Sequence, residues 1–147
     1  MSDSPTVFCV IPVHNRLDDT RRCLAYLSEQ DYTNLQIVII DDGSTDGTGE
    51  FLSNSGLANL TVLNGDGSLW WGGAMHMGIE HVTRLARQHD YLLMLNDDVR
   101  VEKDYVSTLV EDSFQNKASV IGSPQRDEGS GRFGGGGGQS DCLGGTV

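Results

Sequence analysis

Two acidic turns are the parts of this chain best suited to chemistry. The first, Asp41-Asp42-Gly43, follows the apolar run 35–40, and the second, Asn96-Asp97-Asp98, follows the run 91–95. Runs this apolar are typical of buried strands, and a parallel sheet presents its ligand crevice at the carboxyl ends of its strands. Carboxylates at that edge of the sheet are therefore in position to bind a ligand. The alternative, that these aspartates only shape turns and cap helices, explains one such turn more readily than two.

The chemistry that these turns favour is binding of a divalent cation together with a phosphorylated molecule. The chain has no G-x-x-x-x-G-K-[ST] phosphate loop, and Gly65-x-Gly67 lacks the third glycine of a dinucleotide fingerprint. Carboxylates alone would repel a diphosphate, whereas a divalent cation reverses the local charge and bridges hard oxygen ligands. The pattern therefore predicts Mg²⁺ or Mn²⁺.

Alternating strands and helices would position the two turns. Short apolar runs predict strands at 7–11, 35–40, 60–63, 91–95 and 118–121. Apolar residues at helical spacing predict helices at 18–30, 74–88 and 102–114, with a short helix after Gly47. Such alternation predicts an α/β fold, a three-layer α/β/α sandwich around a mostly parallel, Rossmann-like sheet with right-handed crossovers.

Composition divides the chain into two expected parts. Residues 1–122 have the length and apolar content for one domain, which would carry both acidic turns. Residues 123–147 include the pentaglycine Gly134 to Gly138, resemble a flexible linker, and would hold the start of an incomplete acceptor region. The chain then ends on apolar residues, which predicts a sequence truncated within a longer fold.

Charge and composition exclude several classes of partner. The net charge of −11 opposes attraction to nucleic acid, and no run of 18 apolar residues predicts a transmembrane segment. Residues 2–8 lack the pattern of a signal peptide, and three cysteines without metal-ligand spacing fit reduced thiols. The sequence thus predicts a cytoplasmic protein.

Three motifs resemble the donor-binding half of family 2 glycosyltransferases. In chain order they read VIPVHNR at 10–16, VIIDDGSTDG at 38–47 and LNDD at 95–98. The resemblance spans about residues 7–122. It implies the glycosyltransferase A-type (GT-A) fold, a nucleotide-diphospho-sugar donor linked to UDP or dTDP, and inverting transfer to a hydroxyl of a saccharide or lipid-linked acceptor. It further implies bacterial polysaccharide biosynthesis, in the cytoplasm or peripherally at the inner membrane.

The resemblance also assigns the nucleotide contacts. Asp42 would accept a hydrogen bond from the N3–H of uracil or thymine, because an ionised carboxylate accepts but cannot donate. Further donor contacts are implied for Pro12, Val13, His14, Asn15 and Gly73.

The second acidic turn would be this chain's form of the family's aspartate-x-aspartate motif. Asp97 would lie toward the ribose, and Asp98 would ligate the metal. Asn96 departs from the usual first aspartate, since an amide oxygen brings no charge. Metal affinity would then depend largely on Asp98 and the phosphates of the donor.

Two further positions near the donor carry weaker expectations. The Trp70-Trp71 pair is expected to fill a core or the base of a loop rather than to stack on a ligand. Met75 and His76 occupy positions where relatives often carry arginine and asparagine. We therefore do not expect a positively charged side chain at these positions to bind the diphosphate.

The catalytic residues are not assigned. In the family the general base lies beyond a Leu-Gly-Gly region that Leu143-Gly144-Gly145 resembles, so we expect this chain to bind nucleotide weakly and to transfer nothing. One alternative is a truncated, non-catalytic nucleotide-binding or assembly module. A sugar-phosphate nucleotidyltransferase is a second, less favoured because residues 12–16 replace its glycine-rich arginine and lysine motif.

Overall fold

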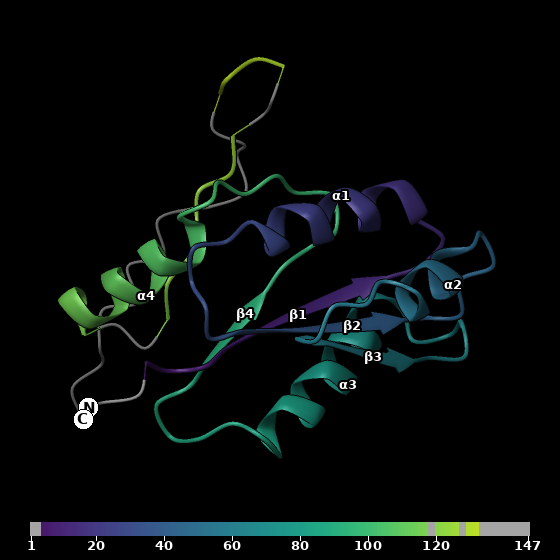
Figure 1. The fold of residues 1–147 in the computed structure, drawn as a ribbon, viewed down its shortest axis with the longest axis horizontal. Coiled ribbons are helices and arrows are strands. Elements are labelled where there is room, and N and C mark those ends of the chain that lie inside the picture. The colour runs from purple at the N-terminus through teal and green to yellow at the C-terminus, as the bar shows by residue number, and fades with distance from the viewer. Residues whose placement is uncertain (1–3, 118–119, 127–128, 133–147) are drawn as a thin grey trace. The chain divides into compact units, whose positions relative to one another are not determined.

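The computed structural model describes residues 4–117, 120–126 and 129–132. The chain forms two compact units, the first reaching Thr108 and the second beginning at Leu109. Figure 1 labels the helices and strands, which in chain order are β1 (Val7–Val13), α1 (Leu17–Ser28), β2 (Leu35–Asp41), α2 (Thr48–Ser53), β3 (Leu60–Asn64), α3 (Trp70–Thr83), β4 (Tyr91–Met94) and α4 (Tyr105–Asn116).

The sheet of the first unit has four strands in the order β3-β2-β1-β4, and every neighbouring pair is parallel. Val7 of β1 is in register with Leu35 of β2 on one side and with Tyr91 of β4 on the other. The chain steps outward from β1 to β3 and then crosses back to place β4 on the opposite side of β1. This reversal creates a switch point at the carboxyl ends of β1 and β4, where α/β sheets bind ligands.

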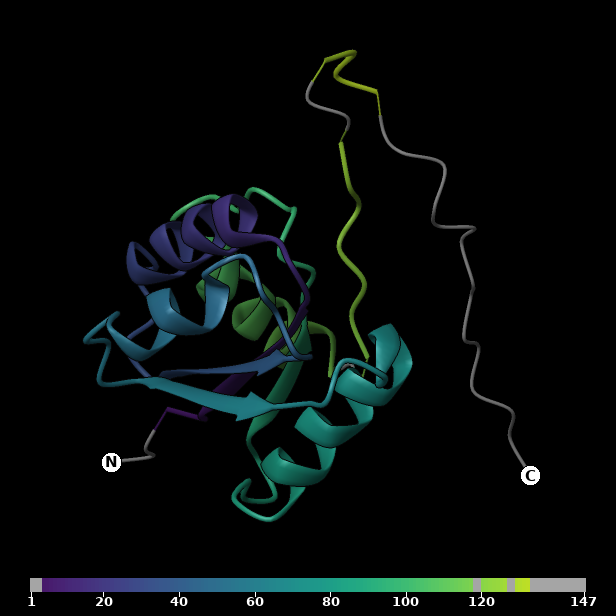
Figure 2. The ribbon, with the colours of Figure 1, turned by 90° about the vertical axis from the view of Figure 1, so that its right-hand side faces the viewer.

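Helices cover both faces of this sheet, as the sequence predicts. Figures 1 and 2 show α1 and α2 on one face and α3 on the other. Gly78 allows α3 to lie close to the sheet, because a Cβ atom there would collide with the side chains of Val10 and Ile40. The core between α3 and the sheet consists of Phe8, Val10, Val38, Ile40, Ala74, Met75 and Val82. The expected three-layer α/β/α architecture is confirmed for this unit.

Most element boundaries differ from the sequence prediction by a few residues, and two of these differences affect the site. β1 continues through Pro12 to Val13, beyond the expected exit turn. The Val10 carbonyl points toward β4, where it accepts a hydrogen bond from Leu95 N–H. The backbone of Pro12 faces the same side, because residues two apart in a strand do so. The pairing of β1 with β4 ends at Val10, so the N–H that proline lacks is not needed there. α3 covers Trp70–Thr83 rather than 74–88, so the tryptophan pair belongs to its first turn.

The expected fifth strand at 118–121 is wrong for residues 120–121, which are the part of it that the structure describes. Val120 and Ile121 lie in no strand and are 89% and 37% exposed, so their apolar side chains do not join a sheet. Residues 118–119, the pentaglycine segment and Leu143-Gly144-Gly145 lie outside the described residues. In the part of the chain that the structure describes, no helix is long and apolar enough to span a bilayer.

Candidate functional site

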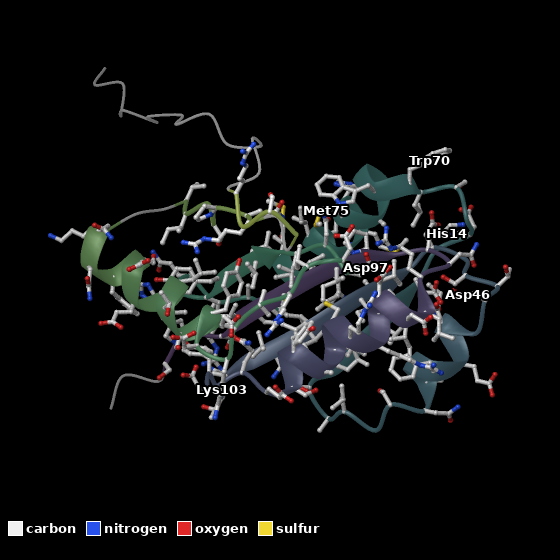
Figure 3. The ribbon with its side chains drawn as sticks, turned by 90° about the horizontal axis from the view of Figure 1, so that it is seen from above. His14, Asp46, Trp70, Met75, Asp97 and Lys103 are labelled. Atoms are coloured by element: carbon white, nitrogen blue, oxygen red, sulfur yellow. The ribbon has the colours of Figure 1, made fainter. Side chains whose placement is uncertain are left out.

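A cavity of about 360 Å³ opens at the carboxyl ends of β1, β2 and β4, within the range of small-molecule sites. Figure 3 shows His14, Trp70 and Asp97 at this same end of the sheet. The lining residues are Pro12, Val13, His14, Arg16, Asp42, Gly67, Trp70, Trp71, Ala74, Asn96, Asp97 and Asp98. Asp42 and Asp98 therefore face one cavity, which is the arrangement that a shared ligand requires.

Of the residues with a predicted donor or metal role, all but Asn15 and Gly73 line this cavity. The Asn15 side chain instead accepts a hydrogen bond from Thr45 N–H at 2.7 Å and contacts His14 Nε2 at 3.1 Å. Gly73 lies in the first turn of α3, where its N–H donates to the Leu69 carbonyl. Direct contact of these two residues with a nucleotide stays a prediction.

Asp42 is buried and organises the loop between β3 and α3. Its Oδ1 accepts a hydrogen bond from Gly67 N–H at 2.8 Å, and its Oδ2 accepts from Leu69 and Trp70 N–H, each at 3.0 Å. Gly65 is required beside it, because a Cβ atom there would come within 2.5 Å of Asp42 Oδ1. A carboxylate has about four acceptor sites, so three are used internally and one on Oδ1 remains for a ligand.

Side chains of the β1–α1 loop fix the wall next to Asp42. His14 donates a hydrogen bond from Nδ1 to the Asp42 carbonyl at 2.5 Å, while its Nε2 accepts from the Asn15 amide. Asn15 N–H donates to Ser44 Oγ at 2.8 Å, and Asn15 has a φ of 52°, a conformation that asparagine tolerates. The loops after β1 and β2 therefore hold each other in place.

The second acidic turn has far fewer internal partners. Asp97 is 6% exposed, and its Oδ2 has no hydrogen-bond partner. Burial raises the pKa of Asp97 to about 6, against the opposing effect of Arg16 and with a further rise from Asp98. Asp98 has a half-exposed side chain. Unlike the Asp42 carboxylate, which is held by backbone N–H groups, the carboxylates of this turn are held by one arginine side chain.

Arg16 is a site residue that the sequence reasoning did not find. Its Nε lies 3.3 Å from Asp97 Oδ1 and its Nη2 lies 3.3 Å from Asp98 Oδ2. The only sequence signal was its place beside His14 and Asn15 in the first motif, since Asp98 lies 82 positions away.

Cys23 of α1 lies near the two acids of this turn. Burial raises the pKa of Cys23 to about 12, and the charges of Asp97 and Asp98 add to the rise. Cys23 is therefore a protonated thiol and a poor metal ligand.

The expectation that the tryptophan pair fills a core is wrong. Trp70 and Trp71 are 83% and 57% exposed, and both line the cavity. The physical reason is that Ala74 and Met75 occupy the buried face of α3 next to them. Trp71 Nε1–H donates a hydrogen bond to Asn96 Oδ1 at 2.9 Å. This contact orients Asn96, the residue of the second turn that replaces the usual first aspartate.

The residues present fit a divalent cation that takes most of its ligands from elsewhere. No group of three or more His, Cys, Asp or Glu side chains within the described ranges could hold a metal ion. Asp98 nevertheless offers a hard, accessible carboxylate, and Asp97 Oδ2 is a buried oxygen without a partner. Mg²⁺ is commonly held by one or two carboxylates together with substrate phosphates and water.

The α/β sandwich is the GT-A fold, and similar solved structures share it. The TarS 1–349 structure from S. aureus, in complex with UDP, matches with a TM-score of 0.66 and 19% identity, over 82% of this chain and 38% of that one. Mannosyltransferase PcManGT from Pyrobaculum calidifontis, in complex with GDP-Man and Mn²⁺, matches with a TM-score of 0.66 and 21% identity, over 86% and 37%.

The chain belongs to glycosyl transferase family 2, whose family model matches residues 8–139. Glycosyltransferase GlyG of Streptococcus pneumoniae is 27% identical over 120 residues, which make up 80% of this chain and 38% of GlyG. The chain thus spans well under half the length of the relatives it matches.

Proposed function

We propose that this chain binds a UDP- or dTDP-linked sugar and forms the donor half of an inverting glycosyltransferase. The observation that carries the proposal is the convergence of both acidic turns on one cavity at the switch point of the sheet. Family membership supports a nucleotide-sugar donor, as do the UDP and GDP-Man bound to the two similar structures. The acceptor would be a hydroxyl of a saccharide or of a lipid-linked molecule.

The base contact in this proposal is made by Asp42. One acceptor site on Oδ1 remains after Gly67 N–H has been satisfied. The N3–H of uracil or thymine would donate to that site, whereas N3 of cytosine is itself an acceptor and would meet the carboxylate unfavourably. Pro12, Val13 and His14 would form the adjoining wall of the nucleoside pocket.

The diphosphate contact in this proposal is made through Mg²⁺ or Mn²⁺ held by Asp98. The cation would supply positive charge between the carboxylates and the phosphates, which otherwise repel each other. Asp97 would lie toward the ribose, and Asn96, oriented by Trp71, would contribute a neutral oxygen. The Mn²⁺ in the PcManGT complex supports a divalent ion in this fold. We assign no general base among the described residues.

Titration of UDP into the 147-residue chain by isothermal calorimetry tests this function. We expect UDP to bind roughly tenfold more tightly in Mn²⁺ than in EDTA, because the ion joins diphosphate to carboxylate. Asp98→Ala should remove this difference. Asp18→Ala is the matched control, since that carboxylate on α1 is 90% exposed and lines no part of the cavity.

Equal UDP affinity in Mn²⁺ and in EDTA would contradict the proposal, and so would a difference that survives Asp98→Ala. Either result would favour the alternative of a non-catalytic binding or assembly module.

A further inference from the structure

Arg16 places a fixed positive charge against both acids of the second turn. Of the described residues that line the cavity, it is the one lysine or arginine. Its guanidinium lies 3.3 Å from an oxygen of Asp97 and 3.3 Å from an oxygen of Asp98. Its Nη2 also lies 2.9 Å from Asp19 Oδ2, which ties the guanidinium to the first turn of α1.

A divalent cation at Asp98 would share that carboxylate with Arg16, and the Asp97 oxygen that Arg16 does not contact is buried. Asp98 Oδ2 is engaged by the guanidinium, and an ion bound to Asp98 would lie within a few ångströms of a like charge. An arginine does not relieve this repulsion by losing its proton, because it stays charged at neutral pH. Arg16 would therefore compete with an ion for Asp98 until another anion entered the cavity.

A nucleoside diphosphate is the anion that would relieve this competition. Guanidinium groups form bidentate hydrogen bonds to phosphate oxygens as readily as to carboxylates. With Arg16 turned toward a phosphate, Asp98 Oδ2 would be free for the ion, and Asp97 Oδ1 would be released from the same guanidinium.

We propose that Arg16 is a positioning residue that keeps the Asp97–Asp98 pair closed to a free divalent cation and releases it when a nucleoside diphosphate binds. This inference rests on the proposed function and adds the order of events to it. Binding of the ion and of the nucleotide is then coupled, and each raises the affinity of the other by the same factor.

The affinity for Mn²⁺, measured by electron paramagnetic resonance of the free ion with and without UDP, tests this coupling. Arg16→Gln should bind Mn²⁺ alone about fivefold to tenfold more tightly than the wild type, because the competing charge is gone. UDP should then raise the Mn²⁺ affinity of this variant by a smaller factor than in the wild type. Arg22→Gln is the matched control, because Arg22 also pairs with Asp19 but lines no part of the cavity.

Two results would overturn the role of Arg16. One is Mn²⁺ affinity in Arg16→Gln no higher than in Arg22→Gln, and the other is an undiminished effect of UDP in Arg16→Gln. Arg16→Lys is the second variant if Arg16→Gln lowers the melting temperature in EDTA. Lysine keeps the charge but not the planar fork, so we expect its Mn²⁺ affinity to lie between those of the wild type and Arg16→Gln.

Asp98→Ala in the Arg16→Gln background separates the two proposals. Unchanged Mn²⁺ binding in this double variant would refute the metal site itself. Loss of Mn²⁺ binding, together with equal behaviour of Arg16→Gln and Arg22→Gln, would refute the role of Arg16 alone.

Discussion

The two acidic turns look alike in the sequence, yet the fold uses them differently. The Asp42 carboxylate after β2 accepts three backbone hydrogen bonds, while the preceding Asp41 accepts one from Ser44 N–H at 3.0 Å. After β4, Asp97 keeps one buried oxygen without a partner, and the protein cation that faces Asp97 and Asp98 is Arg16. The aspartates after β2 are therefore held mainly by backbone N–H groups, whereas those after β4 are held mainly by one arginine side chain.

Asp42→Ala should produce the largest change in stability. Three N–H groups, two in the loop before α3 and one at its first residue, would lose a charged acceptor in a partly buried place, so we expect the free energy of unfolding to fall by about 3 kcal/mol. Urea unfolding monitored by circular dichroism measures this loss. Asp98→Ala should change the free energy of unfolding by less than about 1 kcal/mol, because its carboxylate is half exposed. Equal losses in the two variants would contradict the contrast between the turns.

Asp97→Asn should have a smaller and opposite effect that depends on pH. Burial raises the pKa of Asp97 to about 6, so the folded state holds this proton more tightly than the unfolded state. The free energy of unfolding of the metal-free protein therefore falls as pH rises from about 4 to about 6, and the loss is complete above 6. Asp97→Asn should remove this loss and raise stability by about 1–2 kcal/mol at pH 7.5.

Urea unfolding in EDTA at several pH values measures the effect of Asp97→Asn. The two proteins should be closest in stability near pH 4, where the carboxyl is protonated in both states. A constant difference between them at every pH would show that burial of the Asp97 charge is not its cause.

The layered fold and the position of the site could be predicted from local patterns. Apolar runs of the right length gave the four strands, and the rule that ligands bind at strand carboxyl ends placed the turns at one edge. The start of α3 could not be predicted in this way. It is determined by the Asp42 carboxylate, which binds the N–H of Leu69 and Trp70 from another loop. In the sequence alone, the glycines before Ala74 favour a loop over a helix.

The difference between the acidic turns was likewise not predictable from spacing. Asp42 and Asp98 are each the second aspartate of a pair. The hydrogen-bond partners of their carboxylates lie 25 or more positions away in the chain. The tryptophan pair was wrongly expected to be buried for a related reason. Apolar composition does not say which face of a helix meets the sheet, and α3 presents Ala74 and Met75 to it instead.

A crystal structure of the chain with UDP and Mn²⁺ tests the central claim most directly, namely that the two turns act on one nucleotide through a shared ion. The account predicts Mn²⁺ between the Asp98 carboxylate and the diphosphate, and the uracil N3–H donating to Asp42 Oδ1. A nucleotide bound away from this cavity, or a diphosphate bound in it without the ion, would contradict the account.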